Sequence, residues 1–514
     1  MKNTKKIQTN NVLNFYLKKI LDSNVYDVAK ETPLDFATNL SEKLNNKIFL
    51  KREDTQPTFS FKIRGAYNKI VNLDAKDLKK GIIAASAGNH AQGVSLAANK
   101  LGISSTIVMP NTTPRVKVEA VKQLGSKIII SGDSYSDAYE YAMQVGNKEK
   151  LVFIHPFDDD DVIAGQGTVG MEILRQSSSD LEAIFVAVGG GGLISGVGAY
   201  IKAVRPYIKI IGVQTEDSDA MTKSLRCKKR ILLKNVGLFS DGTAVKQVGK
   251  KTFKLSKIVV DEMILVNTDE VCAAIKDIFE DTRCIQEPAG ALALAGLKKW
   301  VNLNKISAKN IVAITCGANI NFDRLRFISE RSELGEEKET LLSVTLPEER
   351  GSFLKFCSLI ENRNVTEFNY RISNDSSANV FVGIQVKDRA EGKVVIKVLK
   401  KEGFLVNDLT YDELSKLHVR HMVGGRSTLA TNEKLYRFEF PERPGALMKF
   451  LSSMNSGWNI SLFHYRNHGS DTGRIMVGLQ VPTGEADELN IFLKSLGYNY
   501  VNETKNTAYN LFLK

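Results

Sequence analysis

The sequence predicts an α/β protein, with parallel-sheet βαβ lobes over the first 330 residues and two ferredoxin-like βαββαβ units after them. Between about residues 47 and 320, short apolar runs such as GIIAAS, STIVMP and KIIIS alternate with helical stretches, which is typical of βαβ units. At residues 329–340, SERSELGEEKET, the chain becomes charged and apolar periodicity lapses. We therefore expect a large domain at 1–330, a linker at 331–340, and smaller domains at 341–418 and 432–514.

The first element with unusual chemistry is PTFSFKIRGAY, residues 57–67. A helix is expected to begin near Phe61, capped by Thr58 or Ser60. Lys62 then lies in the first turn, where the positive end of the helix dipole disfavours an ammonium group. The pKa of Lys62 is therefore expected to fall.

The neighbours of Lys62 are expected to act in the same direction. Phe59 and Phe61 desolvate the amine, and Arg64 adds a second cation nearby. A neutral amine is a nucleophile, so one interpretation is a Schiff-base lysine and the other is an ordinary basic helix face. Gly65 would let a bulky, flat partner approach the helix backbone.

The next loop, SAGNH at residues 86–90, follows the strand GIIAAS and precedes a helix rich in small residues. The hydroxyl of Ser86 and the loop N–H groups are suited to a substrate carboxylate, and Asn89 to a ring hydroxyl. A structural role for His90 is as compatible with the sequence as a catalytic one.

The stretch AIFVAVGGGGLISGV reads as a buried strand, a tetraglycine turn at Gly189–Gly192 and a helix that starts near Leu193. Successive backbone N–H groups at a helix start form a cradle suited to phosphate. The sequence matches neither a P-loop nor the six-position Rossmann pattern. A tight strand-to-helix turn without a ligand is the alternative.

A further strand, IVAITCGANINF, ends at Cys316, for which a buried apolar thiol is the plain interpretation. Taken together, the four segments offer an amine nucleophile, a phosphate cradle, a carboxylate-binding loop and a weakly polar group. Pyridoxal phosphate needs such a site, because the protein holds its phosphate and ring while the cofactor supplies the electron sink.

The C-terminal repeat has an offset of about 94 to 95 residues: LPEERGSFLKF recurs as FPERPGALMKF, NVTEFNYR as NISLFHYR, and VGIQV as VGLQV. Each unit reads as βαββαβ, the ferredoxin-like order. The loops PEERGSF and PERPGAL offer N–H groups at a helix start, suited to an amino-acid carboxylate. The candidate regulatory residues are Gly351, Gly445, Ala446 and Leu447.

Composition narrows the class of protein. The net charge is +12, but the basic residues are scattered and no nucleic-acid module appears. The five cysteines are widely spaced, with no C-x-x-C pair, so neither a disulfide framework nor a metal site is expected. No secretory leader or membrane helix is expected either, and a cytoplasmic location fits best.

Seven motifs also resemble, in this order, the fold-type II pyridoxal-phosphate enzymes, and most closely the biosynthetic threonine dehydratases (threonine ammonia-lyases). They are KREDTQPTFSFKIRGAYNK, SAGNHAQGV, HPFDDDDVIAGQGTVGMEIL, GGGGLISGV, FSDGTAVK, EPAGALALAG and CGANINFDRLR. The duplicated tail resembles the two ACT-like regulatory domains of that family.

The resemblance implies a role for each site residue. Lys62 forms the Schiff base, and the other residues implied to bind the cofactor are Phe61, Asn89, Gly189, Gly190, Gly191, Gly192, Leu193 and Cys316. The implied substrate-binding residues are Ser86, Ala87, Gly88, Asn89 and His90, with Lys62 and Ser86 as catalytic residues. Most members carry Ser where this chain has Cys316, a change similar to that in serine dehydratases. Related racemases carry Ser where this chain has Ala87, so racemisation is disfavoured.

The implied reaction is α,β-elimination of water from L-threonine, giving 2-oxobutanoate and ammonia, the committed step toward isoleucine. L-isoleucine is the expected inhibitor, L-valine a second candidate effector, L-serine a second substrate, and a homotetramer the expected assembly. Two alternatives stay open: a serine-preferring dehydratase, and an amino-acid sensor with a degenerate catalytic domain.

Overall fold

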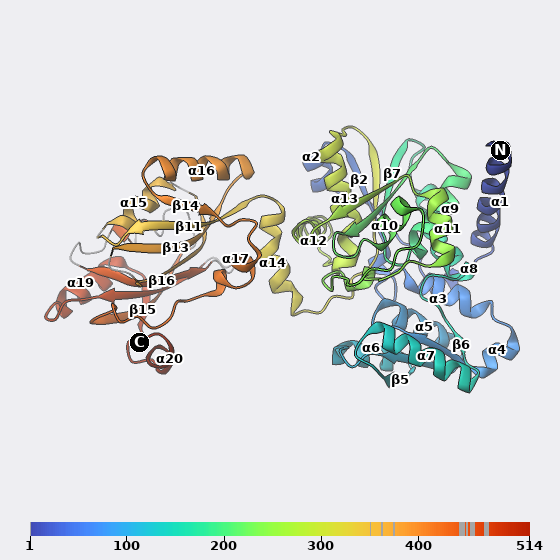
Figure 1. Cartoon of the computed structure of the whole chain (residues 1–514), viewed down its shortest axis with the longest axis horizontal. Coiled ribbons are helices and arrows are strands. Elements are labelled where there is room, and N and C mark those ends of the chain that lie inside the picture. The colour runs from blue at the N-terminus through green and yellow to red at the C-terminus, as the bar shows by residue number, and fades with distance from the viewer. Residues whose placement is uncertain are drawn as a thin grey trace. The chain divides into compact units, whose positions relative to one another are not determined.

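A computed structural model describes residues 2–349, 351–360, 363–373, 376–441, 448, 451–452, 458–466 and 472–514 (Figure 1). The chain divides into an N-terminal unit, residues 1–332, and a C-terminal unit, residues 333–514. Among the described residues, none of the helices combines the length and apolar character that crossing a membrane requires.

The N-terminal unit contains a six-stranded sheet with strand order β1-β2-β10-β7-β8-β9. Only β1 runs antiparallel to its neighbour, so the predicted, mainly parallel sheet is confirmed. Its strands are β1 (Leu34–Phe36), β2 (Lys47–Arg52), β10 (Asn310–Thr315), β7 (Leu181–Ala187), β8 (Lys209–Thr215) and β9 (Glu262–Val266). We call this sheet and its helices the large lobe.

A second, four-stranded parallel sheet, of order β5-β4-β3-β6, forms the small lobe. Its strands are β3 (Ile82–Ala85), β4 (Ser105–Met109), β5 (Lys127–Ile130) and β6 (Val152–Phe153). The inner strands β3, β4, β7 and β10 are almost wholly buried on both faces, which explains their continuous apolar runs.

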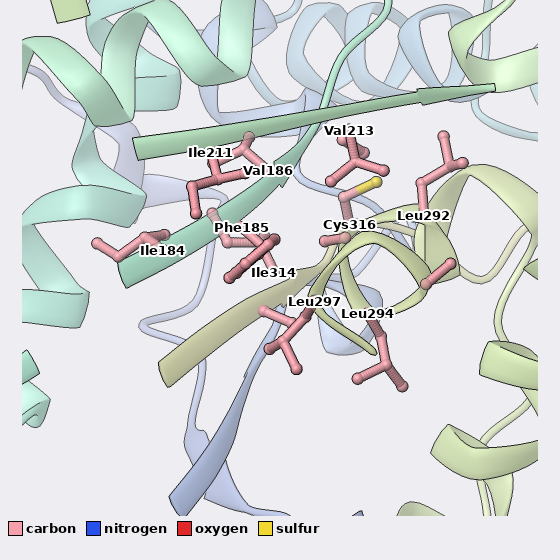
Figure 2. Close-up of a cluster of buried hydrophobic side chains, with 14 of the residues drawn as sticks. Ile184, Phe185, Val186, Ile211, Val213, Leu292, Leu294, Leu297, Ile314 and Cys316 are labelled. Carbon is pink, nitrogen blue, oxygen red and sulfur yellow. The ribbon is translucent and has the colours of Figure 1, made fainter. Parts of the chain in front are cut away.

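Helices connect the parallel strands of the N-terminal unit. They are α1 (Lys2–Leu21), α2 (Thr38–Leu44), α3 (Lys62–Val71), α4 (Ala75–Lys80), α5 (Asn89–Lys100), α6 (Arg115–Gln123), α7 (Tyr135–Glu149), α8 (Asp160–Gln176), α9 (Gly192–Val204), α10 (Ala220–Cys227), α11 (Lys250–Val259), α12 (Thr268–Thr282) and α13 (Pro288–Asn304). Helix α13 packs along the large sheet, where Leu292 and Leu297 join Phe185 and Ile314 in the core (Figure 2).

The predicted linker, residues 331–340, is not an irregular segment. Helix α14 (Arg324–Gly335) crosses the boundary between the units, and strand β11 (Glu339–Pro347) begins soon after it. Leu334 is buried against Leu341 and Phe381 inside the C-terminal unit, which stabilises the end of this charged helix. Charged residues of the segment, Arg331 and Glu339, are themselves buried, so its charge marks neither a solvated face nor a break in structure.

The C-terminal unit contains both halves of the repeat. The first half is β11, α15 (Ser352–Leu359), β12 (Val365–Arg371), β13 (Ser377–Gln385), α16 (Arg389–Lys401) and β14 (Leu405–Asp408), as predicted. The second is β15 (Glu433–Pro441), β16 (Asn459–Arg466), β17 (Thr472–Gln480), α19 (Ala486–Leu496) and β18 (Asn499–Asn502); its predicted first helix, ALMKFLSSM, lies largely outside the described residues. Pairing of β12 with β16 joins the halves into one antiparallel, eight-stranded sheet. Two further short helices are α17 (Glu413–Leu417) and α20 (Thr507–Phe512).

Candidate active site

Lys62 is the first residue of α3, and the segment before it is tied to the end of β10. The backbone N–H of Phe61 donates to the carbonyl of Cys316 at 3.3 Å, and the N–H of Ala318 donates to the carbonyl of Phe59 at 2.9 Å. Two predicted site residues far apart in the sequence, Lys62 and Cys316, are therefore held side by side.

The predicted side-chain cap of α3 is wrong. Phe61 occupies the N-cap position, and the hydroxyls of Thr58 and Ser60 have no hydrogen-bond partner among the described residues. Phe59 adopts the left-handed φ of +53°, uncommon for a residue with a side chain. Backbone bonds to the end of β10 therefore shape this turn.

The amine of Lys62 lies in an enclosed site. Its Nζ donates to the carbonyl oxygen of Pro156 at 3.4 Å and lies 5.2 Å from the centre of the Phe61 ring. Burial lowers the pKa of Lys62 to about 8, while the nearby Cys316 and Glu287 act in the opposite direction. A substantial fraction of the amine is therefore neutral near physiological pH.

Two predicted causes of this pKa shift are wrong. The Phe59 side chain is 57% exposed, so it does not desolvate the amine. The Arg64 guanidinium is fully buried between Glu53 and Glu172, whose carboxylates it meets at 2.7 and 2.6 Å, so its charge is compensated. The Lys62 amine is therefore desolvated by its general burial and not by these two side chains.

Gly65 serves packing rather than a ligand. A Cβ at this position would lie 2.4 Å from Nε2 of Gln166 and 2.7 Å from the carbonyl oxygen of Val162. Both belong to α8, which crosses α3 here. The bulky partner expected beside Gly65 is therefore a helix of the same chain.

The tetraglycine loop follows β7 and leads into α9, which begins at Gly192, one residue before the predicted Leu193. A Cβ on Gly190 would lie 2.3 Å from the Phe157 ring, and Gly191 has a φ of +97°. Thr252 donates its hydroxyl proton to the carbonyl of Gly190 at 2.7 Å. The loop is thus fixed with bare backbone N–H groups at a helix start, which suits phosphate.

The loop at residues 86–90 connects β3 to α5, whose first residue is Asn89. The N–H of Gly88 lies 3.2 Å from the Ser86 hydroxyl oxygen, which accepts its bond, and Ala87 brings no hydroxyl. The His90 ring lies 2.9 Å from the Ile154 carbonyl, and burial lowers the pKa of His90 to about 3. The imidazole is therefore neutral and bonded to the backbone of β6's following residue, Ile154.

Sequence reasoning missed two polar residues of the site. The Asn89 amide donates to Oε1 of Glu287 at 2.5 Å, and the Asn319 amide donates to Oδ1 of Asn89 at 2.7 Å. Burial, with Asp241 nearby, raises the pKa of Glu287 to about 7. Both residues stand in quoted motifs, EPAGALALAG and CGANINFDRLR, but neither motif indicated a contact with Asn89.

Comparisons with known proteins agree with this geometry. A family model described as pyridoxal-phosphate dependent enzyme matches residues 25–317, and a model of the C-terminal regulatory domain of threonine dehydratase matches residues 330–419 and 424–513. The L-threonine dehydratase biosynthetic IlvA of Burkholderia multivorans is 58% identical over 97% of this chain and 99% of its own. The mitochondrial threonine dehydratase of Schizosaccharomyces pombe is 50% identical over 97% of this chain and 84% of its own.

The chain belongs to the biosynthetic threonine dehydratase family. Among solved structures, the processed form of threonine deaminase isoform 2 from Solanum lycopersicum superposes with a TM-score of 0.62 at 47% identity, covering 63% of this chain and 89% of its own. The family uses pyridoxal phosphate, and the site described above fits that group. Lys62 would supply the amine and Gly189–Gly192 the phosphate cradle, and Asn89, which bonds Glu287 and Asn319, would lie beside the ring.

Cys316 stands at the position where we expect most members of this dehydratase family to carry serine. Its thiol is buried among apolar side chains (Figure 2) and donates to the Ala289 carbonyl at 3.2 Å. Burial raises the pKa of Cys316 far above its usual range, so the thiol stays protonated and uncharged. It is therefore a weakly polar, uncharged group at the end of β10.

Of the four candidate regulatory residues, the structure describes only Gly351. It lies at the N-cap of α15 with a φ of +89°, and no described atom lies within 4 Å of a Cβ built there. Gly445, Ala446 and Leu447 lie outside the described residues. The described part of the chain contains no cluster of side chains arranged to hold a metal ion.

Proposed function

We propose that this threonine dehydratase family member deaminates L-threonine to 2-oxobutanoate and ammonia by α,β-elimination of water, in the cytoplasm, as the committed step toward isoleucine. The observation that carries the proposal is the Lys62 amine: burial lowers its pKa to about 8, and its partner Pro156 precedes Phe157, which packs against Gly190 of the glycine loop. The relatives named as L-threonine dehydratases, similar over nearly the whole chain, support the choice of substrate.

Lys62 has two tasks in this proposal. When bound, pyridoxal phosphate supplies the electron sink that makes the substrate α-hydrogen acidic. Lys62 would hold that group through its Nζ, and the same amine would serve as a base toward the bound substrate. With a pKa of about 8, the neutral amine can accept the α-proton at physiological pH.

The loop at residues 86–90 orients the substrate. The Ser86 hydroxyl and the backbone N–H groups at the start of α5 are suited to the carboxylate. Because Ala87 lacks a hydroxyl, it cannot return a proton to the opposite face of the substrate. The chain thereby favours elimination over racemisation.

A serine-preferring dehydratase is a second candidate, favoured by Cys316. The neutral thiol would give the cofactor ring a weak partner, as a serine hydroxyl would, and either would leave the ring largely unprotonated. Loss of the β-hydroxyl is then expected to run close to concerted with proton removal for either substrate. The regulatory-domain match argues for the threonine reaction.

We also propose that L-isoleucine inhibits the enzyme through the C-terminal unit, with L-valine as a second effector, and that the enzyme is a homotetramer. An effector need only favour a less active state by about 1–3 kcal/mol to control the rate. The regulatory-domain match over residues 330–419 and 424–513 supports an effector site in this unit.

The experiment measures 2-oxobutanoate release from L-threonine and pyruvate release from L-serine, each with and without L-isoleucine. A higher kcat/KM for threonine, with suppression by isoleucine, supports both parts of the proposal. A preference for serine would instead establish the second candidate, and a rate that ignores isoleucine would contradict the effector assignment.

A further inference from the structure

The segment FSDGT, residues 239–243, lies against the cofactor site. A Cβ on Gly189 of the phosphate cradle would lie 3.1 Å from Cα of Thr243. A Cβ on Gly242 would lie 2.9 Å from Cβ of Ala289 and 3.7 Å from Oε1 of Glu287. A displacement of this segment therefore alters both the phosphate cradle and the surroundings of Glu287.

The same segment is bonded to the small lobe. Asp241 accepts a bond from the ammonium of Lys117 at 2.8 Å, and both side chains are partly buried. Lys117 belongs to α6 of the small lobe, whereas the segment belongs to the large lobe. This ion pair therefore joins the two lobes beside the active site.

A third contact connects the segment to α14. Arg324, the first residue of α14, donates to the Phe239 carbonyl at 3.0 Å and lies 3.6 Å from Oδ1 of Asp241. The rings of Phe239 and Phe327 are 5.3 Å apart between centres. The start of α14 thus contacts both the backbone and the aromatic ring of the segment.

Helix α14 contributes to the cores of both units. Phe327 and Ile328 pack in the core of the N-terminal unit, whereas Leu334 packs in that of the C-terminal unit. A change of conformation in the C-terminal sheet that shifts Leu334 also acts on the first turns of the same helix. These turns hold the segment at residues 239–243.

We propose that the segment Phe239–Thr243 is the coupling element between the C-terminal unit and the active site, with Arg324 and Phe327 as its contacts to α14 and Lys117 as its contact to the small lobe. The inference rests on the proposed regulation and names its route. Release of Phe239 by α14 loosens the phosphate cradle and the Asp241–Lys117 ion pair together, which lowers turnover. These are positioning residues, because they act on the site through other groups.

The test uses the full-length holoenzyme and the double variant R324Q/F327L, which weakens the contact between α14 and the segment. The matched control is R326Q, because Arg326 lies on the same helix with its side chain 72% exposed and pairs with Glu330. Isoleucine binding is measured by calorimetry, and inhibition by 2-oxobutanoate release. Coupling energies in allosteric proteins correspond to about 5- to 150-fold in affinity, so the loss is measurable.

We expect R324Q/F327L to bind isoleucine within about threefold of the wild type and to be less active without effector, while the fold-inhibition by saturating isoleucine is about tenfold smaller than in the wild type. R326Q is expected to behave as the wild type in both assays. Inhibition of R324Q/F327L by isoleucine to the same extent as the wild type would overturn the proposal. Loss of isoleucine binding in this variant would overturn it too, because the contact would then belong to the effector site.

A second arm needs neither threonine nor isoleucine. Dissociation constants for pyridoxal phosphate are measured by cofactor fluorescence for R324Q/F327L, K117Q and the combination. Because these residues meet through one segment, we expect the combined effect to differ from the product of the separate effects by about threefold or more. Simple multiplication would overturn the proposed route. If isoleucine does not change the rate of the wild type, only the assignment of isoleucine as effector fails. The cofactor-affinity measurements then test the coupling through the segment by themselves.

Discussion

Replacing Gly190 with alanine tests whether the tetraglycine loop is the phosphate cradle. The new Cβ would lie 2.3 Å from Cδ1 and Cγ of Phe157 and 2.4 Å from Cε1. Non-bonded carbon atoms keep a separation of about 3.5 Å, so the ring or the loop must move by about 1.2 Å. Because Phe157 follows Pro156, whose carbonyl accepts the bond from Lys62, the movement disturbs two parts of the site.

Overpacking of this kind costs about 1–3 kcal/mol. The loop relaxes in the cofactor-free protein, whereas the bound form needs the cradle in place, so most of the cost is expected as lost affinity. At 1.4 kcal/mol per factor of ten, the dissociation constant of pyridoxal phosphate rises about 5- to 150-fold. Titration of the cofactor-free variant, followed by visible absorbance, measures this change.

Two controls accompany the measurement. At Gly425, a Cβ would meet no described atom within 4 Å, so G425A is expected to keep wild-type affinity. Shortening the clashing ring in G190A/F157L is expected to recover part of the affinity lost in G190A. An affinity for G190A within about twofold of the wild type would refute the reasoning, since even the smallest overpacking cost exceeds that factor.

Three further predictions concern Cys316, Glu287 and Arg64. Because a thiol and a hydroxyl are both neutral partners, C316S should change kcat for threonine by at most about threefold. C316D introduces a carboxylic acid and should lower kcat about tenfold or more. Equal rates for C316S and C316D would contradict this prediction. In the folded protein the pKa of Glu287 is about 7, above its usual value of 4.5. Between pH 4.5 and 7 the folded protein therefore binds more protons than the unfolded chain, so the free energy of unfolding falls as the pH rises through this range. Thermal unfolding of the cofactor-free E287Q variant should therefore depend less on pH between 5 and 8 than the wild type, and an unchanged dependence would disprove the assignment. Replacing the buried Arg64 with methionine leaves Glu53 and Glu172 without their shared cation, at a cost of about 3–5 kcal/mol of unfolding free energy. R326Q at the exposed pair should cost under about 1 kcal/mol, and similar thermal shifts for these two variants would count against the buried network.

Sequence reasoning succeeded where the signal is local. The strand, the tetraglycine turn and the helix after it are contiguous in the sequence, and their predicted order is confirmed. The βαββαβ order of the first repeat half follows in the same way from alternating apolar runs. The lowered pKa of Lys62 is confirmed, although its cause is burial in the site and neither Phe59 nor Arg64 contributes as predicted.

The remaining features depend on segments distant in the chain. Glu287 and Asn319 meet Asn89 only because β10 and the start of α13 converge on α5, and no short motif reports such a contact. Phe157 shapes the glycine loop from a segment thirty or more positions earlier. The failed cap before α3 has the same origin, because backbone bonds to the end of β10 replace the expected side-chain bond.

The most direct test of the account compares the wild type with K62A, with K69A as a matched control on the same helix. Each protein is loaded with pyridoxal phosphate, its visible absorbance is recorded, and 2-oxobutanoate release from L-threonine is measured. We predict that the wild type and K69A show both the Schiff-base band and turnover, and that K62A shows neither. A K62A variant that keeps the band and releases 2-oxobutanoate would contradict the central claim.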